Sequence, residues 1–99
     1  MSDIIYSQSQ IKDILGPVFK SHNVKKAILF GSYAKGSATG HSDVDILVDS
    51  GLRGLSFFGL LEDVVTSLDK NVDLIDTSQI VPDSEIENEI AASGVVIYG

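Results

Sequence analysis

Apolar, β-branched runs alternate along this chain with segments whose apolar residues recur at helical spacing, which limits the fold to a sheet packed against helices. The predicted strands cover residues 24–30, 43–49, 72–75 and 95–98, and the predicted helices cover residues 8–22, 55–68 and 82–93. Residues 31–42 are rich in Gly, Ser, Ala and Thr, which predicts a loop with room for a helical turn. This order predicts an α/β or α+β domain with one sheet.

Glycine, proline and serine residues indicate where the three predicted helices begin, end or are interrupted. Gly16 and Pro17 interrupt the first, and because Pro17 cannot donate a backbone hydrogen bond, we expect a kink or two short helices. Ser56 is the expected N-cap of the second helix. Pro82 is expected near the first turn of the third helix, and Gly94 just past its end.

Length and composition limit the classes of function. A chain of 99 residues has the size of one small domain, so residues 1–99 are interpreted as a single domain. No apolar run approaches the roughly 20 residues of a membrane span, and the first ten residues lack the pattern of a signal peptide. Cysteine is absent, which excludes disulfides and thiolate zinc sites and fits a cytoplasmic location.

The net charge of −7 disfavours a large nucleic-acid substrate, because an acidic surface repels a phosphate backbone. A basic protein is a better electrostatic partner for such a surface. On charge alone, however, a role in solubility is the favoured explanation.

Asp43 and Asp45 form the first candidate site. Residues i and i+2 of a strand share one face, so the two carboxylates are expected to project together while Val44 faces the core. Paired carboxylates repel each other unless a cation lies between them, and hard oxygen ligands of this kind suit Mg²⁺. An isolated Asp-x-Asp, taken by itself, is more often a solvated pair of surface acids.

Gly31 and Ser32, directly after a predicted strand, change that interpretation. Glycine lets the backbone approach a ligand closely, backbone N–H groups at a helix start attract anions, and the Ser32 hydroxyl adds a donor for a phosphate. Alone, Gly-Ser after a strand is a common turn. Together with Asp43 and Asp45 it predicts a nucleoside triphosphate and its Mg²⁺ side by side.

These residues carry a family resemblance. Gly31-Ser32, ten intervening residues and then Asp43-x-Asp45 resemble the signature of the DNA polymerase beta nucleotidyltransferase superfamily. The longer run FGSYAKGSATGHSDVDILV, residues 30–48, is similar to its smallest branch, the minimal nucleotidyltransferases. The resemblance extends over essentially the whole chain and implies a polymerase-beta-like fold, in which a single mixed β-sheet is flanked by helices.

The resemblance also implies a third carboxylate on a neighbouring strand, and Asp73 matches that position. Asp76 is the competing acid, but it has the opposite strand parity and lies at the strand end, so it is interpreted as a cap or loop residue. Many family members carry arginine where this chain has Lys35, and lysine lacks the bidentate geometry of arginine. The role of Lys35 therefore stays open.

The implied reaction is in-line attack on the α-phosphate of a nucleotide. Asp43 and Asp45 would hold two Mg²⁺ or Mn²⁺ ions about 4 Å apart. Asp73 would bind the metal on the nucleophile side and help to take the proton of the acceptor. Gly31 and Ser32 would hold the β- and γ-phosphates while pyrophosphate leaves.

Other polar and aromatic residues receive simpler interpretations. His22 is expected to cap or pack the first helix, and His41 is expected at the loop surface. Tyr33 is expected either to stack near the nucleotide or to pack at the surface. Ser42 is expected to form a hydrogen bond within the turn before the second strand.

Two classes of function remain. The resemblance implies an enzyme that transfers AMP from ATP to a hydroxyl of another protein. Minimal nucleotidyltransferases are commonly encoded beside HEPN proteins, so the implied partner is a HEPN-type ribonuclease toxin, the implied role is that of its antitoxin, and action in a homo- or hetero-oligomer is expected. The alternative is a non-catalytic nucleotide- or partner-binding module that neutralises its partner by forming a complex.

Overall fold

The computed structural model describes residues 4–99, which form four strands in one sheet, four α-helices and one 3-10 helix. These are α1 (Gln8–Ser21), β1 (Lys26–Phe30), α2 (Gly31–Lys35), β2 (Val44–Asp49), α3 (Leu55–Leu68), β3 (Val72–Asp76), the 3-10 helix η1 (Thr77–Gln79), α4 (Glu85–Ser93) and β4 (Val95–Tyr98). Residues 1–3, which begin the segment expected to lack a signal peptide, lie outside the description. Among the described helices, none is long and apolar enough to cross a membrane.

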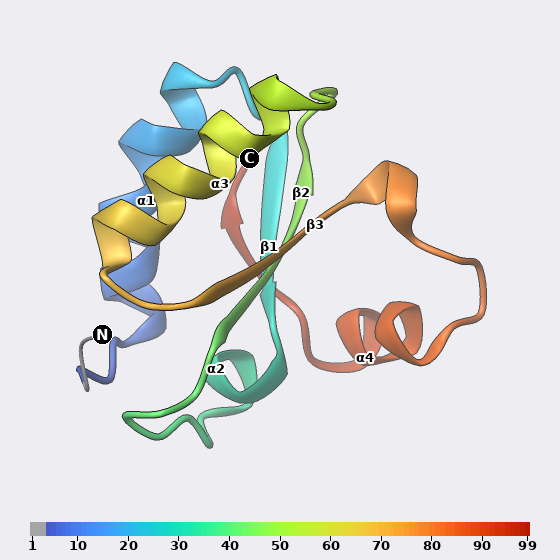
Figure 1. Cartoon of the computed structure of the whole chain (residues 1–99). Coiled ribbons are helices and arrows are strands. Elements are labelled where there is room, and N and C mark those ends of the chain that lie inside the picture. The colour runs from blue at the N-terminus through green and yellow to red at the C-terminus, as the bar shows by residue number, and fades with distance from the viewer. Residues whose placement is uncertain (1–3) are drawn as a thin grey trace.

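The sheet has the strand order β3-β2-β1-β4. β1 pairs antiparallel with both β2 and β4, whereas β2 and β3 are parallel. The parallel pair is possible because α3 crosses back over the sheet between β2 and β3 (Figure 1). The predicted single mixed sheet with flanking helices is therefore confirmed.

Helices α1 and α3 lie together on one face of the sheet (Figure 1). Alternate residues of β2 point into this layer, and Val44, Ile46 and Val48 have no exposed surface, as their spacing predicted. Apolar side chains of the helices complete the core: Ile11, Leu15 and Phe19 from α1, and Leu60, Val64 and Leu68 from α3. The packing of these side chains fixes which strand residues face the helices and which face away.

The opposite face of the sheet is only partly covered. Helix α4 lies on this side, away from α1 and α3, and contacts α2 and β1 (Figure 1). Residues of this face, such as Ile28, Asp45 and Ile75, are half-buried rather than fully buried. Side chains on this face therefore remain accessible to a ligand.

The helix boundaries differ from prediction in three places. Helix α1 is continuous through Pro17, so the alternative of two short helices was wrong, while the alternative of a kink stays a prediction. Because Pro17 and Asp13 are both exposed, water can satisfy the carbonyl that proline leaves unpaired. The N-cap of α3 is Gly54, with a φ of 57°, and Ser56 lies inside the first turn. Pro82 precedes α4, which begins after Ser84, whose side chain accepts a hydrogen bond from the N–H of Glu87.

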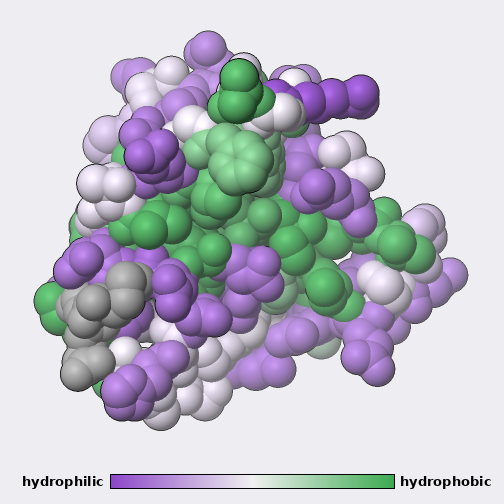
Figure 2. Space-filling model, viewed as in Figure 1, coloured by the Kyte–Doolittle hydropathy of each residue, from purple (hydrophilic) through white to green (hydrophobic). Residues whose placement is uncertain are grey.

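Apolar side chains also gather at the surface near the start of α3. Leu55 and Phe58 of α3 are among the most exposed large apolar residues, and Figure 2 shows apolar side chains from the top to the middle of the viewed face. An open cavity of about 380 Å³ lies here, lined by Arg53 just before α3, by Phe58 of α3 and by residues of η1. It includes Asp76, at the carboxyl ends of the parallel strands, and so is separate from the predicted site.

Candidate active site

Two aspartates lie side by side on the open face of the sheet. In the parallel pairing of β2 and β3, Asp45 is the register partner of Asp73. The neighbouring Val44 and Leu74 belong to the hydrophobic core, so the two aspartates point to the opposite face. Asp45 is half-buried and Asp73 is exposed. The register thus brings together two of the three predicted carboxylates.

Asp43 is exposed and lies immediately before β2. The N–H of the next residue, Val44, donates a hydrogen bond of 3.1 Å to the carbonyl of Asn71, just before β3. This bond ties the segment that carries Asp43 to the segment that carries Asp73. All three predicted acids therefore lie at the amino ends of the same two parallel strands.

Gly31 lies against Asp45 at the junction of β1 and α2. Phe30, the last residue of β1, is the register partner of Asp45, and α2 begins at the next residue. Gly31 has a φ of 70°, and a Cβ added to it would overlap the carboxylate of Asp45. Only glycine allows this approach. Ser32 follows, half-buried, in the first turn of α2, as the prediction of a helical turn requires.

Asp45 is in an environment that disfavours its charge. Partial burial, together with the negative charges of Asp73, Asp43 and Glu89, raises the pKa of Asp45 from 3.8 to about 6. The three predicted carboxylates are therefore close enough to interact electrostatically. A cation bound among them would favour the ionised form of all three.

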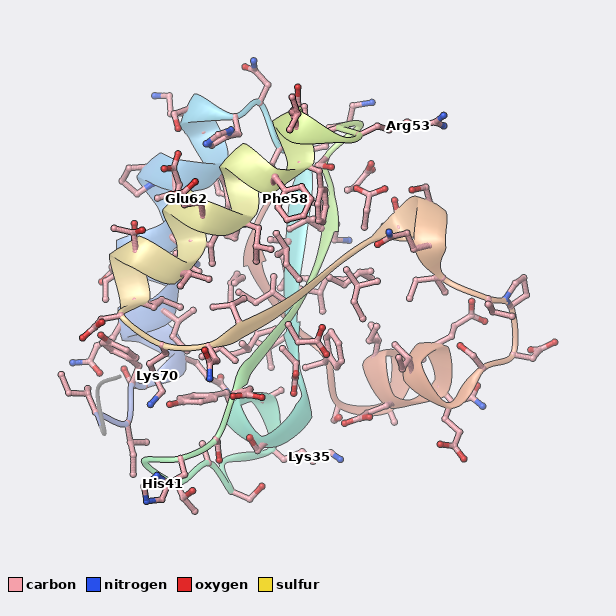
Figure 3. The ribbon with its side chains drawn as sticks, viewed as in Figure 1. Lys35, His41, Arg53, Phe58, Glu62 and Lys70 are labelled. Carbon is pink, nitrogen blue, oxygen red and sulfur yellow. The ribbon has the colours of Figure 1, made fainter. Side chains whose placement is uncertain are left out.

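Glu89 is a further carboxylate at this site, and it was not predicted. It comes from α4, and its Oε1 lies 3.2 Å from Nζ of Lys35, the last residue of α2. Figure 3 shows the Lys35 side chain extending from α2 on the side where α4 lies. The sequence holds no specific signal for this role, because Glu89 is one of three glutamates at alternate positions of the same helix.

The carboxylates match a divalent metal in kind, but their side chains do not converge. Oxygen donors with a local excess of negative charge are what Mg²⁺ and Mn²⁺ prefer. Within residues 4–99, however, no group of three or more His, Asp or Glu side chains is arranged to hold a metal ion. The residues therefore fit the metal chemically, while the site is not preassembled around a metal centre.

Lys70 holds the loop between α2 and β2 in place. This lysine is only 3% exposed, and its Nζ donates a hydrogen bond of 3.1 Å to the carbonyl of Gly40 (Figure 3). Within the loop, the N–H of Ser42 donates to the carbonyl of Thr39, and the N–H of Thr39 donates to Oγ of Ser42. The predicted hydrogen bonding of Ser42 in this turn is confirmed, whereas the burial of Lys70 was not predicted.

Asp76 is a capping residue, as its strand parity predicted. It is 5% exposed, it is the N-cap of η1, and it accepts hydrogen bonds from Ser50 and Ser78. Burial alone would raise the pKa of Asp76, but the hydrogen bonds from Ser50 and Ser78 outweigh it and lower the pKa to about 2.

The two histidines have the simple roles that were expected. His22 is the C-cap of α1, and its Nε2 lies 2.6 Å from Oδ2 of Asp63 on α3. His41 is exposed in the loop (Figure 3). Tyr33 was predicted to lie either near the nucleotide or at the surface. The surface alternative is wrong, because Tyr33 is 4% exposed and packs within the core, and the alternative near the nucleotide stays a prediction. Its buried hydroxyl has no hydrogen-bond partner among residues 4–99.

Comparison with known proteins places this geometry in context. Residues 9–99 match the model of the family described as polymerase beta, nucleotidyltransferase. A protein of Methanocaldococcus jannaschii that is provisionally named a protein adenylyltransferase is 36% identical over 77 residues, which cover 75% of this chain and 82% of the relative.

Solved structures resemble the fold. A chain in the crystal structure of a toxin–antitoxin with AMP-PNP aligns with a TM-score of 0.74 and 24% identity, over 89% of this chain and 73% of that chain. A chain in the structure of tri-AMPylated Shewanella oneidensis HEPN toxin in complex with MNT antitoxin aligns with a TM-score of 0.68 and 22% identity, over 93% and 72% of the two chains. At these identities, the two alignments establish a shared fold.

Proposed function

The chain belongs to the polymerase beta nucleotidyltransferase family, and from that membership we propose that it transfers AMP from ATP to a hydroxyl group of a partner protein. The observation that carries this proposal is the in-register pair of Asp45 and Asp73 on the open sheet face, with Gly31 against Asp45. The name of the archaeal relative supports AMP as the transferred group, and the tri-AMPylated toxin supports a protein as the acceptor.

The proposed roles follow the positions of the residues. Gly31 and Ser32 hold the triphosphate, Asp43 and Asp45 are the ligands for Mg²⁺ or Mn²⁺, and Asp73 completes the metal site on the acceptor side. When bound, the metal supplies positive charge that offsets the charge developing on the phosphoryl oxygens.

In the transfer itself, the acceptor oxygen forms a bond to the α-phosphorus while the bond from that phosphorus to the bridging α–β oxygen breaks, and pyrophosphate leaves. Asp73 takes the proton of the acceptor hydroxyl. This role suits its location, because β3 is an edge strand of the sheet and Asp73 is exposed there. A hydroxyl on another protein can therefore approach Asp73. We place the reaction in the cytoplasm, where ATP is available.

We propose further that the acceptor is a HEPN-type ribonuclease toxin and that this chain is its antitoxin. Both structural neighbours come from toxin–antitoxin complexes, and one of these contains a HEPN toxin. The net charge of −7 complements a basic RNA-binding partner. AMP attached near the RNA site of the toxin would add bulk and negative charge where RNA phosphates bind, which gives inactivation a physical route.

A second candidate function is neutralisation of the partner by binding alone. The observation in its favour is that no three acidic side chains converge on a metal centre within residues 4–99. This candidate needs neither nucleotide nor metal. It therefore predicts that variants of the three aspartates neutralise the partner as well as the parent does.

Co-expression with a HEPN partner separates the two candidates. The parent, Asp45→Asn and the control Asp49→Asn would each be expressed with the toxin, and the toxin weighed by mass spectrometry. Asp49 lies on the same strand and the same sheet face as Asp45, four residues further on. Transfer predicts a toxin heavier by AMP with the parent and Asp49→Asn but not with Asp45→Asn. Equal neutralisation by all three without added mass would leave the binding function, and no neutralisation by any would remove both.

A further inference from the structure

The ion pair between Lys35 and Glu89 joins α2 to α4 next to the proposed active site. Lys35 follows Gly31 by four residues and is the last residue of α2. Gly31 is the residue that packs against the carboxylate of Asp45. Lys35 is therefore at the end of the short helix that begins against Asp45, and Glu89 reaches it from α4.

Glu89 interacts electrostatically with both Lys35 and Asp45. It pairs with the ammonium of Lys35, and its negative charge also contributes to raising the pKa of Asp45. One carboxylate is thus shared between a cation and a like charge. The negative charge of Glu89 is favoured in this position only while the Lys35 ammonium is paired with it, because the like charge of Asp45 repels it.

The pair is also accessible to solvent. The side chain of Lys35 is 51% exposed and that of Glu89 is 34% exposed. Exposed ion pairs of this kind contribute little to the stability of the fold, because water and salt screen them. A more highly charged anion in the same place can therefore replace Glu89 as the partner of Lys35 at small cost.

We propose that Glu89 is a positioning residue of the nucleotide site, which pairs with the ammonium of Lys35 in the free protein and releases it to the triphosphate when nucleotide binds. This inference rests on the proposed function and deepens it. The triphosphate carries several negative charges, so it competes successfully with one carboxylate for Lys35. The released Glu89 then lies next to bound phosphate, and its repulsion limits the affinity for nucleotide.

Calorimetric titration of AMP-PNP in the presence of Mg²⁺ tests this exchange with four proteins: the parent, Lys35→Met, Glu89→Gln and the double variant. Lys35→Met is expected to weaken binding about tenfold, the loss of one charge-assisted hydrogen bond. Glu89→Gln is expected to tighten binding about three- to tenfold when Lys35 is present, and distinctly less in the Lys35→Met background. Glu85→Gln is the matched control, since Glu85 is an exposed acid one turn earlier on α4, and it should leave the affinity unchanged.

Comparison of the four proteins distinguishes an exchange of Lys35 between Glu89 and the triphosphate from simple repulsion by Glu89. If Glu89→Gln tightens binding equally in both backgrounds, Glu89 acts by simple repulsion and the exchange is wrong. Unchanged or weaker binding by Glu89→Gln in the parent background also overturns it. Thermal melting of each variant verifies that the fold is intact. If the parent itself binds no nucleotide, the proposed function fails, which is distinguishable from a parent that binds with no coupling between Lys35 and Glu89.

Discussion

Gly31 and Asp45 meet at the end of β1 with no room for a side chain between them. The backbone of Gly31 has a φ of 70°, and a Cβ there would lie 3.1 Å from Cγ of Asp45 and closer still to one carboxylate oxygen. Asp45 is therefore placed by its own strand and also by the backbone of the residue that begins α2. A change at Gly31 is expected to act on the site through Asp45.

Gly31→Ala should displace the Asp45 carboxylate and lower turnover by at least tenfold, with a loss of stability of about 1–2 kcal/mol from the left-handed backbone. Gly36→Ala is the matched control, because Gly36 has a φ of 76° but no atom within 4 Å of the added Cβ. Both variants carry similar backbone strain, and only the first meets Asp45. Adenylylation assays and urea denaturation measure the two effects, and equal turnover in both variants would show that the contact with Asp45 is irrelevant.

Asp45→Asn should stabilise the metal-free protein at neutral pH while it abolishes transfer. The pKa of Asp45 is raised from 3.8 to about 6, so the ionised carboxylate costs the fold at most on the order of 3 kcal/mol above that pH. The parent is thus most favoured when Asp45 is protonated, and it loses this stability as the pH rises through about 6. The gain from Asp45→Asn should therefore be large near about pH 7.5 and small near about pH 4.

Urea denaturation of both proteins at the two pH values measures that difference, in which only acids that interact with Asp45 also contribute. The same experiment with added Mg²⁺ should stabilise the parent and leave Asp45→Asn unchanged, because the metal would offset the charge of Asp45. A gain that is independent of pH would contradict the raised pKa.

Asp73→Asn should lower turnover by about 10²-fold or more, with a smaller effect on nucleotide affinity. Asp73 is exposed at the edge of the sheet, on the side from which we propose that the acceptor approaches, whereas Asp45 is half-buried against Gly31. Rapid-quench turnover and AMP-PNP titration separate the two quantities. Equal losses of both would instead assign Asp73 to the nucleotide metal.

Asp76→Asn should destabilise the protein by about 2 kcal/mol at neutral pH without changing nucleotide affinity. The pKa of Asp76 is lowered from 3.8 to about 2 against the effect of burial, by hydrogen bonds from Ser50 and Ser78. Its ionised form stabilises the fold above the unfolded pKa, and this contribution is lost as the pH falls from about 4 toward about 2. Urea denaturation near neutral pH measures the loss, with the exposed Asp69→Asn as the control. A variant as stable as the parent would show that these hydrogen bonds do not stabilise the fold.

The parts of the site that follow from local rules were predictable. Strand alternation places Val44 in the core and Asp45 on the opposite face, whatever the rest of the chain does. The same rule separated Asp73 from Asp76, which lies at the end of β3 and caps η1. These predictions needed only neighbouring residues.

The parts that depend on packing between distant elements were not predictable from such rules. The register of Asp45 with Asp73 joins strands that α3 separates, and Asp73 was identified through the family motif rather than through pairing. The ion pair of Lys35 with Glu89 depends on how α4 packs against α2, and the burial of Lys70 depends on the path of the loop that contains Gly40. No periodicity in the sequence reports these contacts.

Helix ends were predicted less well for a similar reason. Ser56 has the composition of an N-cap, but Gly54 turns the chain two residues earlier, and α3 begins before Ser56 is reached. Pro82 fits a first helical turn, yet Ser84 supplies the capping hydrogen bond and α4 begins after it. In both cases two residues, two positions apart, were suitable, and the backbone path decided between them.

The parallel pairing of β3 with β2 also protects the chemistry against misfolding. If β3 slipped by one residue, Asp73 would turn into the layer beneath α1 and α3, and Leu74 would turn out to solvent. Burying an unpaired carboxylate there costs several kcal/mol, so the inactive arrangement is also the unstable one. The burial of Leu74 therefore fixes the register that keeps Asp73 on the open face, so one apolar side chain both stabilises the core and orients the neighbouring acid.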